Sequence, residues 1–432
     1  MKDFATSEDP AVQAQLDRLA RLTLPQGRLG LDVIHDLLGR LGDPQKHLPP
    51  VFHVAGTNGK GSTCTYLRMM LEAEGLRVHS ATKPHLVRYN ERIRLNGALI
   101  SDEFLGELLK EVLDAGEDLA PSFFEVTTAA TFLAFARIPA DVCVIEVGLG
   151  GRFDATNVLD RPAACGIATL GIDHESFLLV PEEGTPDEPL ARIAFEKAGI
   201  ARSGRPLVTQ HYPEIAEIEV QAAAAREGAP LHMRGQDWHA TITPDAIDYR
   251  DKFGPLTLPL PTMPGVHQGD NAALAVAMLR HQDFVTVSPA AMAEGIRTAR
   301  WPARLQKLST GPLTSHARNR DVWLDGGHNP DAGQAIARHL GGEKLHLVIG
   351  MLSNKDPQAL IKPMEGMLSS LTVVPIPGSE AHSVDAFGAD ARSAPDVATA
   401  LTRLPDDGQR VLIGGSLYLA GQVLKANGEL PD

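Results

Sequence analysis

The segment Val51–Thr63, VFHVAGTNGKGST, constrains the fold of this chain more than any other part of it. The apolar run Val51–Ala55 predicts a buried strand, which passes through a glycine-rich loop into a helical pattern. Glycines let backbone N–H groups approach an anion, and a helix N-terminus adds partial positive charge, so this order predicts a phosphate cradle. Lys60 can reach the β- and γ-phosphates and Ser62 can reach Mg²⁺, although Gly61 separates them and departs from the usual pattern. The alternative is an ordinary glycine-rich turn that binds nothing.

The remaining pattern predicts an α/β protein with two domains. At 432 residues the chain is too long for a single core, and apolar runs alternate with helical patterns, as in βαβ units with a mainly parallel sheet. The predicted strands of the first domain are Val51–Ala55, Val78–Ala81, Val142–Val147, Gly166–Leu170 and Leu207–Gln210. The predicted helices are Lys60–Glu74, Asp102–Ala115, Phe124–Arg137, Pro189–Ala198 and Asp270–Arg280. Between Leu231 and Pro264 the alternation predicts short strands on one edge of the first domain.

A second alternation begins after the segment Thr298–Arg304, which we interpret as the domain boundary. We therefore expect an ATP-binding P-loop domain over residues 1–299 and a smaller Rossmann-like α/β domain over residues 300–432. The predicted strands there are Val322–Leu324, His346–Ile349, Leu371–Val374 and Val411–Ile413. The predicted helices are Asp331–His339, Pro357–Met367, Pro395–Leu404 and Ser416–Leu424.

Composition excludes several classes of partner. Forty basic residues stand against 54 acidic ones, a formal net charge of −14, which argues against a nucleic-acid or anionic-membrane surface. No apolar run is long enough to predict a membrane span, and the N-terminal segment lacks the apolar core of a signal peptide. The three cysteines are sparse and show no metal-binding spacing, which fits a reduced cytoplasm. We therefore expect a cytoplasmic protein, acting as a monomer on small molecules.

A series of motifs in a shared order resembles the folylpolyglutamate synthase/dihydrofolate synthase family of the Mur ligase superfamily, in its bifunctional bacterial form. Besides the glycine loop, the motifs are Lys83–Arg94, Ser122–Thr128, Val144–Val158, Gly171–Glu175, Glu196–Ile200, Trp301–Gln306, Leu324–Pro330 and Gly415–Leu419. The resemblance spans nearly the whole chain, from about Leu29 to Gly421. It implies an ATP-dependent ligase that adds L-glutamate to dihydropteroate and to the γ-carboxylate of reduced folates through an acyl phosphate. Folylpolyglutamate synthase activity alone is the nearest alternative.

Two candidate metal ligands follow predicted strands. Glu146 ends the run VCVIE before a glycine turn, and a carboxylate at that end of a parallel strand points into the ligand crevice. From the residues alone, the Glu146 carboxylate is equally well interpreted as a ligand of Mg²⁺ and as the partner of a nearby arginine. His174 follows another strand, and a lone histidine is more often structural; Asp173 is the weaker alternative ligand there. The resemblance favours metal for both, and it implies that Lys197 is carbamylated and binds a second Mg²⁺, rather than being an ordinary helix lysine. It leaves open a bound monovalent cation.

The resemblance also assigns ATP and substrate contacts. Those to ATP are Thr57, Asn58, Gly59, Lys60, Gly61, Ser62, Asn271, Arg304, Asp325 and His328, and the catalytic residues are Lys60, His174 and Lys197. For the pterin ring, Phe124 would stack on its face and Asp154 would pair with its aminopyrimidine edge. Core packing is the plain alternative for Phe124, and a helix or turn position is the alternative for Asn271 and Asp325. We expect Arg152 and Asn157 to fix their loop.

One departure concerns the metal site. Relatives usually have serine where this chain has Lys83, and an ammonium group cannot ligate a metal. Either water or Thr82 replaces that ligand, or Lys83 binds phosphate directly.

Two other classes compete with this interpretation. A muramyl-peptide ligase is disfavoured because the segment before Val51 is too short for an extra UDP-sugar domain and because Gly61 follows the lysine. A P-loop kinase or a non-catalytic nucleotide-binding protein would not need the second-domain segment DGGHNP or depend on glutamate.

Overall fold

The computed structural model of the protein describes residues 6–22 and 30–431, and its chain forms two compact units. The first unit comprises residues 1–262 and 268–299, and the second comprises residues 263–267 and 300–432. Within the described ranges, no helix is both long enough and apolar enough to cross a membrane.

The first unit is built on an eight-stranded sheet with the order β4-β3-β2-β5-β1-β6-β7-β8. Its central strands run parallel, and only β3 and β4 are antiparallel to their neighbours. The strand bounds are β1 Val51–Ala55, β2 Val78–Ala81, β3 Ile93–Leu95, β4 Ala98–Leu99, β5 Val142–Glu146, β6 Ala164–Ile167, β7 Leu207–Thr209 and β8 Leu231–Met233. Every residue of β1, β2, β5 and β6 is buried, as expected when helices cover both faces of a parallel sheet.

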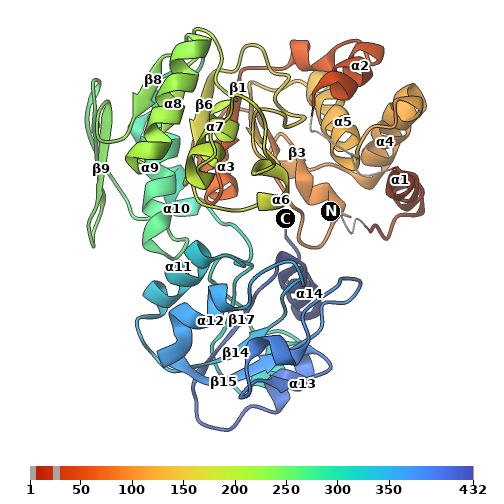
Figure 1. Ribbon diagram of the computed structural model, residues 1–432, viewed down its shortest axis with the longest axis vertical. Coiled ribbons are helices and arrows are strands. Elements are labelled where there is room, and N and C mark those ends of the chain that lie inside the picture. Colours follow the sequence, from red (N-terminus) through yellow and green to blue (C-terminus); the bar gives the residue numbers. More distant parts are fainter. Residues whose placement is uncertain (1–5, 23–29, 432) are drawn as a thin grey trace. The chain divides into compact units, whose positions relative to one another are not determined.

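The helices of the first unit supply most of its core. They are α1 Pro10–Arg21, α2 Asp32–Arg40, α3 Lys60–Ala73, α4 Asp102–Gly116, α5 Phe123–Arg137, α6 Glu175–Leu178, α7 Pro189–Ala198, α8 Glu214–Glu227, α9 Val266–Arg280 and α10 Pro289–Thr298. Helices α1, α2, α4 and α5 gather at one end of the sheet (Figure 1). Their buried apolar side chains belong to one core cluster. Helices α7 and α8 pack together against β6 and β7 in a second cluster.

Residues 231–264 contain the short strands that the sequence predicts for the first domain. Only β8 joins the large sheet, at its edge, while β9 Trp238–Ile242, β10 Ile247–Asp251 and β11 Gly254–Leu258 form a separate three-stranded antiparallel sheet. The prediction of short strands in this part of the first domain is confirmed, and the separate sheet of β9–β11 adds to it. Burial alternates along β10, where Ile247 and Tyr249 are buried while Asp248 and Arg250 face solvent, as is typical of an antiparallel sheet with one face in water.

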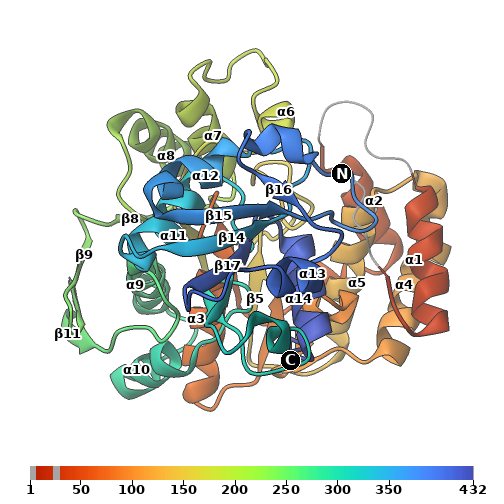
Figure 2. The ribbon, with the colours of Figure 1, turned by 90° about the horizontal axis from the view of Figure 1, so that it is seen from below.

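The second unit carries a six-stranded sheet with the order β12-β13-β17-β14-β15-β16, parallel except for β12 (Figure 2). Its strands are β12 Gln306–Lys307, β13 Val322–Leu324, β14 Leu345–Ile349, β15 Leu368–Val373, β16 Arg392–Ser393 and β17 Arg410–Gly414. Its helices are α11 Pro330–Leu340, α12 Gln358–Met364, α13 Val397–Thr402 and α14 Leu417–Asn427. The unit has its own apolar core around β14.

Candidate active site

The glycine loop joins β1 to α3 as the sequence predicts. Gly59 has a φ of 83°, which favours glycine, and a Cβ there would collide with the amide oxygen of Asn271 on α9. A Cβ on Gly56 would lie 2.9 Å from the Cβ of Ala168. The loop therefore needs both glycines, and it brings Asn271 to the first turn of α3, where Ser62 is buried.

Two side chains hold the loop in shape. The Lys60 ammonium donates hydrogen bonds to the carbonyl oxygens of Gly56 (2.9 Å) and Thr57 (3.1 Å), so it lies inside the curve of the loop. The Thr57 hydroxyl donates to the carbonyl of Gly171 (2.7 Å) and accepts from its N–H (3.1 Å). The N–H groups of Thr57 and Asn58 donate to the Thr169 carbonyl at 2.7 and 3.4 Å. The loop is thus tied to the segment that follows β6.

Glu146 lies at the carboxyl end of β5, beside the end of β1, with only 3% of its surface exposed. One carboxylate oxygen accepts the backbone N–H of Lys83 at 2.9 Å, and the Lys83 ammonium lies 3.4 Å from the Glu146 carbonyl oxygen. The same ammonium lies 3.8 Å from the centre of the Phe124 ring. Burial lowers the pKa of Lys83 to about 8, while Asp154 and Glu146 oppose this shift. At pH 7 the group therefore remains mostly an ammonium.

Lys197 is buried at the end of α7. Burial, with a further contribution from the charge of Lys60, lowers the pKa of Lys197 to about 7, and Asp173 and Asp154 oppose the shift. At neutral pH much of the amine is therefore unprotonated and nucleophilic.

His174 precedes α6 with a φ of 55° and is partly exposed. Its N–H donates to Asp173 at 2.8 Å, and its ring Nε2 lies 3.9 Å from the same carboxylate. The imidazole therefore sits beside a carboxylate on the segment that also anchors the glycine loop.

Asp154 organises the loop that follows β5. Its carboxylate accepts four hydrogen bonds, from the N–H groups of Gly148 (3.0 Å), Leu149 (2.8 Å) and Thr156 (3.0 Å) and from the Thr156 hydroxyl (2.5 Å). The Thr156 hydroxyl in turn contacts the ring of His53 on β1 at 2.8 Å. A Cβ on Gly148 would collide with the Phe124 ring and lie 3.1 Å from Asp154, so the two candidate pterin contacts lie next to each other.

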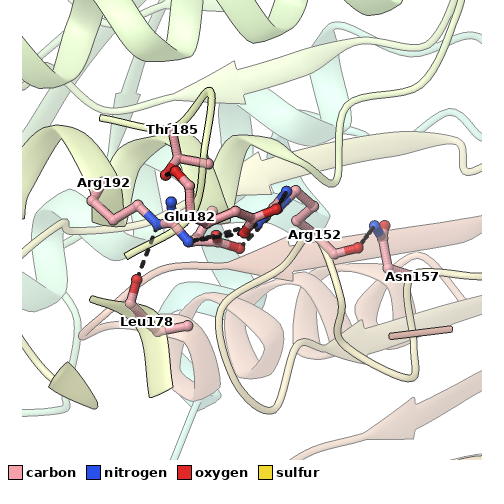
Figure 3. A network of polar contacts seen from close by, with 7 residues as sticks. Arg152, Asn157, Leu178, Glu182, Thr185 and Arg192 are labelled. Atoms are coloured by element: carbon pink, nitrogen blue, oxygen red, sulfur yellow. Dashed lines mark hydrogen bonds and ion pairs between the residues drawn. The ribbon is translucent and has the colours of Figure 1, made fainter. Parts of the chain in front are cut away.

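A cluster of two arginines and two glutamates joins this loop to α7. Arg152 bonds to Glu182 at 2.5 Å and to Glu196 at 2.8 Å, and Arg192 contacts both glutamates at 3.2 and 3.1 Å (Figure 3). Asn157 donates to the Arg152 carbonyl at 3.0 Å, so Arg152 and Asn157 do fix the loop, as predicted. Sequence reasoning missed Glu182, whose acidic Pro/Gly-containing segment gave no local signal of a partner.

The donor set suits a metal ion only in part. No cluster of three or more His, Cys, Asp or Glu side chains with metal-binding geometry occurs in the part of the chain that the structure describes. Glu146 offers a carboxylate and His174 an imidazole, but an unmodified lysine is a poor ligand for a hard cation that prefers oxygen. The set fits Mg²⁺ if Lys197 becomes a carbamate, because that reaction attaches a carboxylate group, with its two oxygens, to the lysine nitrogen.

The remaining candidates lie on the second unit. Asp325 follows β13, and its carboxylate accepts the N–H groups of Leu305 (2.8 Å) and Gly327 (2.6 Å). Burial raises the pKa of Asp325, and the charge of Arg304 opposes this shift. His328 hydrogen bonds through Nδ1 to the Gly326 carbonyl at 3.1 Å. The structure thus gathers Arg304, Asp325 and His328 around one turn of that unit.

A glycine loop between a buried parallel strand and a helix, beside a strand-end carboxylate, defines an α/β protein of the P-loop class. Its two units and two main sheets match the two-domain fold of Mur ligase-like proteins.

Comparisons with known proteins identify the family to which the chain belongs within this class. Dihydrofolate synthase/folylpolyglutamate synthase of Bacillus subtilis is 32% identical over 425 residues, covering 92% of this chain and 94% of that protein. Escherichia coli FolC in complex with DHPP and ADP has a TM-score of 0.84 at 30% identity, covering 96% of this chain and 97% of that one. A bifunctional enzyme with Mn, AMPPNP and L-glutamate bound has a TM-score of 0.83 at 30% identity, covering 99% of both chains. No family model matches the chain. The chain belongs to the folylpolyglutamate synthase/dihydrofolate synthase family.

Proposed function

We propose that this protein is an ATP-dependent ligase that adds L-glutamate to 7,8-dihydropteroate and to the γ-carboxylate of reduced folates. The proposal is supported by the position of Lys60, Glu146 and the Asp154 loop at the carboxyl ends of β1 and β5, with Lys197 of α7 close enough to interact with the charges of Lys60 and Asp154. Its relatives carry the names of both activities, and solved relatives bind ADP, an ATP analogue, manganese and glutamate. The substrates are small molecules. We assign the protein to the cytoplasm as a monomer, which the sparse buried cysteines and acidic surface support.

In the first step, a carboxylate oxygen of the pteroate or folate attacks the γ-phosphorus of ATP, and the bond to the β-phosphate oxygen breaks. ADP leaves and an acyl phosphate forms. The glycine loop orients the phosphates through its N–H groups, and Lys60 neutralises charge as it moves between oxygens. Glu146 and His174 would hold one Mg²⁺ and carbamylated Lys197 a second, and these ions would supply further charge neutralisation at the phosphates.

In the second step, the amine nitrogen of glutamate attacks the acyl carbon, and phosphate leaves. The nitrogen loses a proton and an amide bond remains. Phe124 and Asp154 are assigned to the pterin ring, although Asp154 already accepts four hydrogen bonds within its loop. The further ATP contacts assigned by the resemblance are Thr57, Asn58, Gly59, Gly61, Ser62, Asn271, Arg304, Asp325 and His328.

Purified protein is expected to release phosphate only when ATP, dihydropteroate and L-glutamate are all present. A coupled phosphate assay with each component omitted in turn checks this expectation, with mass analysis of the product. Phosphate release without glutamate would favour a simple ATPase, and ADP formation with a phosphorylated product would favour a kinase. Ligation to tetrahydrofolate but never to dihydropteroate would leave only folylpolyglutamate synthase activity, and ligation to a muramyl substrate would favour that ligase class.

The assignment of a carbamate to Lys197 makes a separate prediction. The unprotonated form of this buried amine can attack CO₂ and lose a proton to solvent, leaving a carbamate anion. Protein equilibrated with ¹³C-bicarbonate should show a carbamate carbon resonance that is absent in Lys197→Arg, and activity should fall in CO₂-depleted buffer. A fully active protein with no such resonance would refute the carbamate.

A further inference from the structure

Lys83 is the one departure from the family pattern that the proposed mechanism does not use, and the structure gives it defined contacts. Its backbone N–H holds one oxygen of Glu146, at 2.9 Å, and its ammonium lies 3.4 Å from the carbonyl of the same residue. Glu146 is buried, so little water lies around its carboxylate to screen that ammonium.

The ring of Phe124 keeps the ammonium in place. The 3.8 Å separation from the ring centre is a cation–π contact, which is attractive and becomes stronger where water is excluded. Phe124 lies in the first turn of α5, whose backbone is held by the capping box between Ser122 and Glu125. The positive charge beside Glu146 is therefore held by packing on one side and by a polar contact on the other.

A fixed positive charge and a divalent cation repel each other. At separations of a few ångströms this repulsion is substantial even in a highly polarisable environment, because one partner carries two charges. The Lys83 N–H also occupies one of the two Glu146 oxygens, which leaves fewer acceptor positions for a metal.

We propose that Lys83 is a built-in competitor of the divalent cation at Glu146. This inference rests on the proposed role of Glu146 as a metal ligand. Lys83 weakens metal binding to the nucleotide-free protein, so that metal enters this site together with the nucleotide, whose phosphates offset the repulsion. Lys83 is thus a positioning residue that sets the order of binding and does not itself react.

The experiment measures Mn²⁺ binding directly, with no turnover. Free aqueous Mn²⁺ gives an electron paramagnetic resonance signal that is lost on binding, so the dissociation constant follows from a titration of nucleotide-free protein at pH 7. The variants are Lys83→Met, which keeps length and packing on Phe124 without charge, and Lys83→Arg, which keeps the charge. Each is also made with Glu146→Gln, so that binding to Glu146 is separated from binding to other acidic groups.

Lys83→Met should bind Mn²⁺ at least about tenfold more tightly than the parent protein, and adding Glu146→Gln should remove that gain. Lys83→Arg should bind as weakly as the parent. Lys83→Gln provides a second uncharged variant should the methionine variant fail to fold. Equal Mn²⁺ affinity in the parent and both uncharged variants would overturn the inference.

The Glu146→Gln results also show whether a negative outcome concerns only Lys83 or the metal site of the proposed function as well. If affinities are equal but Glu146→Gln weakens binding in every background, the metal site stands and only the role of Lys83 falls. If Glu146→Gln changes binding in none of them, the metal assignment of Glu146 falls, and the inference falls with it.

Discussion

Replacing Lys60 with alanine is expected to lower the turnover number by about 10²- to 10³-fold, the usual effect of removing one charge-stabilising donor at a transferring group. The ammonium already lies inside the glycine loop, bonded to the carbonyls of Gly56 and Thr57. The measurement is the steady-state rate of phosphate release at saturating ATP, dihydropteroate and glutamate.

A loss of folding would mimic this result, so two checks accompany it. The lost hydrogen bonds to the loop carbonyls should lower the free energy of unfolding by about 1 kcal/mol, which leaves the protein folded. Lys110→Ala serves as the matched control, because Lys110 lies on α4 of the same unit in an exposed ion pair with Asp114. If Lys60→Ala keeps near-normal ligation, the glycine loop does not bind the reacting phosphates.

Replacing Asp154 with alanine is expected to lower the free energy of unfolding by about 3 kcal/mol or more, because buried N–H donors lose their acceptor. The N–H groups of Gly148, Leu149 and Thr156 all donate to this carboxylate. Ligation of dihydropteroate should fall by about 10²-fold or more, since a site built to bond a polar ring edge loses its partner. Chemical denaturation and the Michaelis constant for dihydropteroate measure the two effects.

Two further variants separate the roles of Asp154. Asp160→Ala removes an exposed carboxylate from the same segment and should change neither quantity. Asp154→Asn keeps one acceptor oxygen, so it should retain more stability than alanine while still binding dihydropteroate poorly. A normal Michaelis constant for dihydropteroate in a folded Asp154→Asn protein would limit Asp154 to holding the loop.

Local patterns predicted the elements that carry the glycine loop and the candidate lysine. The bounds of β1, β2, β13 and α7 agree with the predicted ranges, because each is a short apolar or amphipathic run between clear breakers. Helix α8 escaped prediction because the face it buries consists mostly of alanine, at Ala216, Ala223 and Ala224, which gives little hydrophobic contrast. Strand β6 ends earlier than predicted, since its pairing with β1 stops at Ile167.

The contacts of the candidate site were harder to predict, because they join residues far apart in sequence. No local pattern indicates that the ammonium of Lys83 lies over Phe124, or that Glu182 bonds to two arginines. The turn at Asp154 could have been predicted from the sequence. An aspartate in a turn often accepts a hydrogen bond from the backbone N–H of the residue two positions later, as Asp154 does from Thr156. The assignments of ATP, metal and pterin contacts stay predictions.

The close packing of Gly151 against α7 has an evolutionary consequence. A Cβ on Gly151 would lie 2.8 Å from the Glu196 carbonyl, and one on Gly199 would lie 2.6 Å from the Arg152 Cβ. Neither position can gain a side chain unless the loop and the helix separate, which would also pull Asp154 away from Lys197. Substitution of either glycine should therefore be selected against, because the loop after β5 could no longer pack on α7.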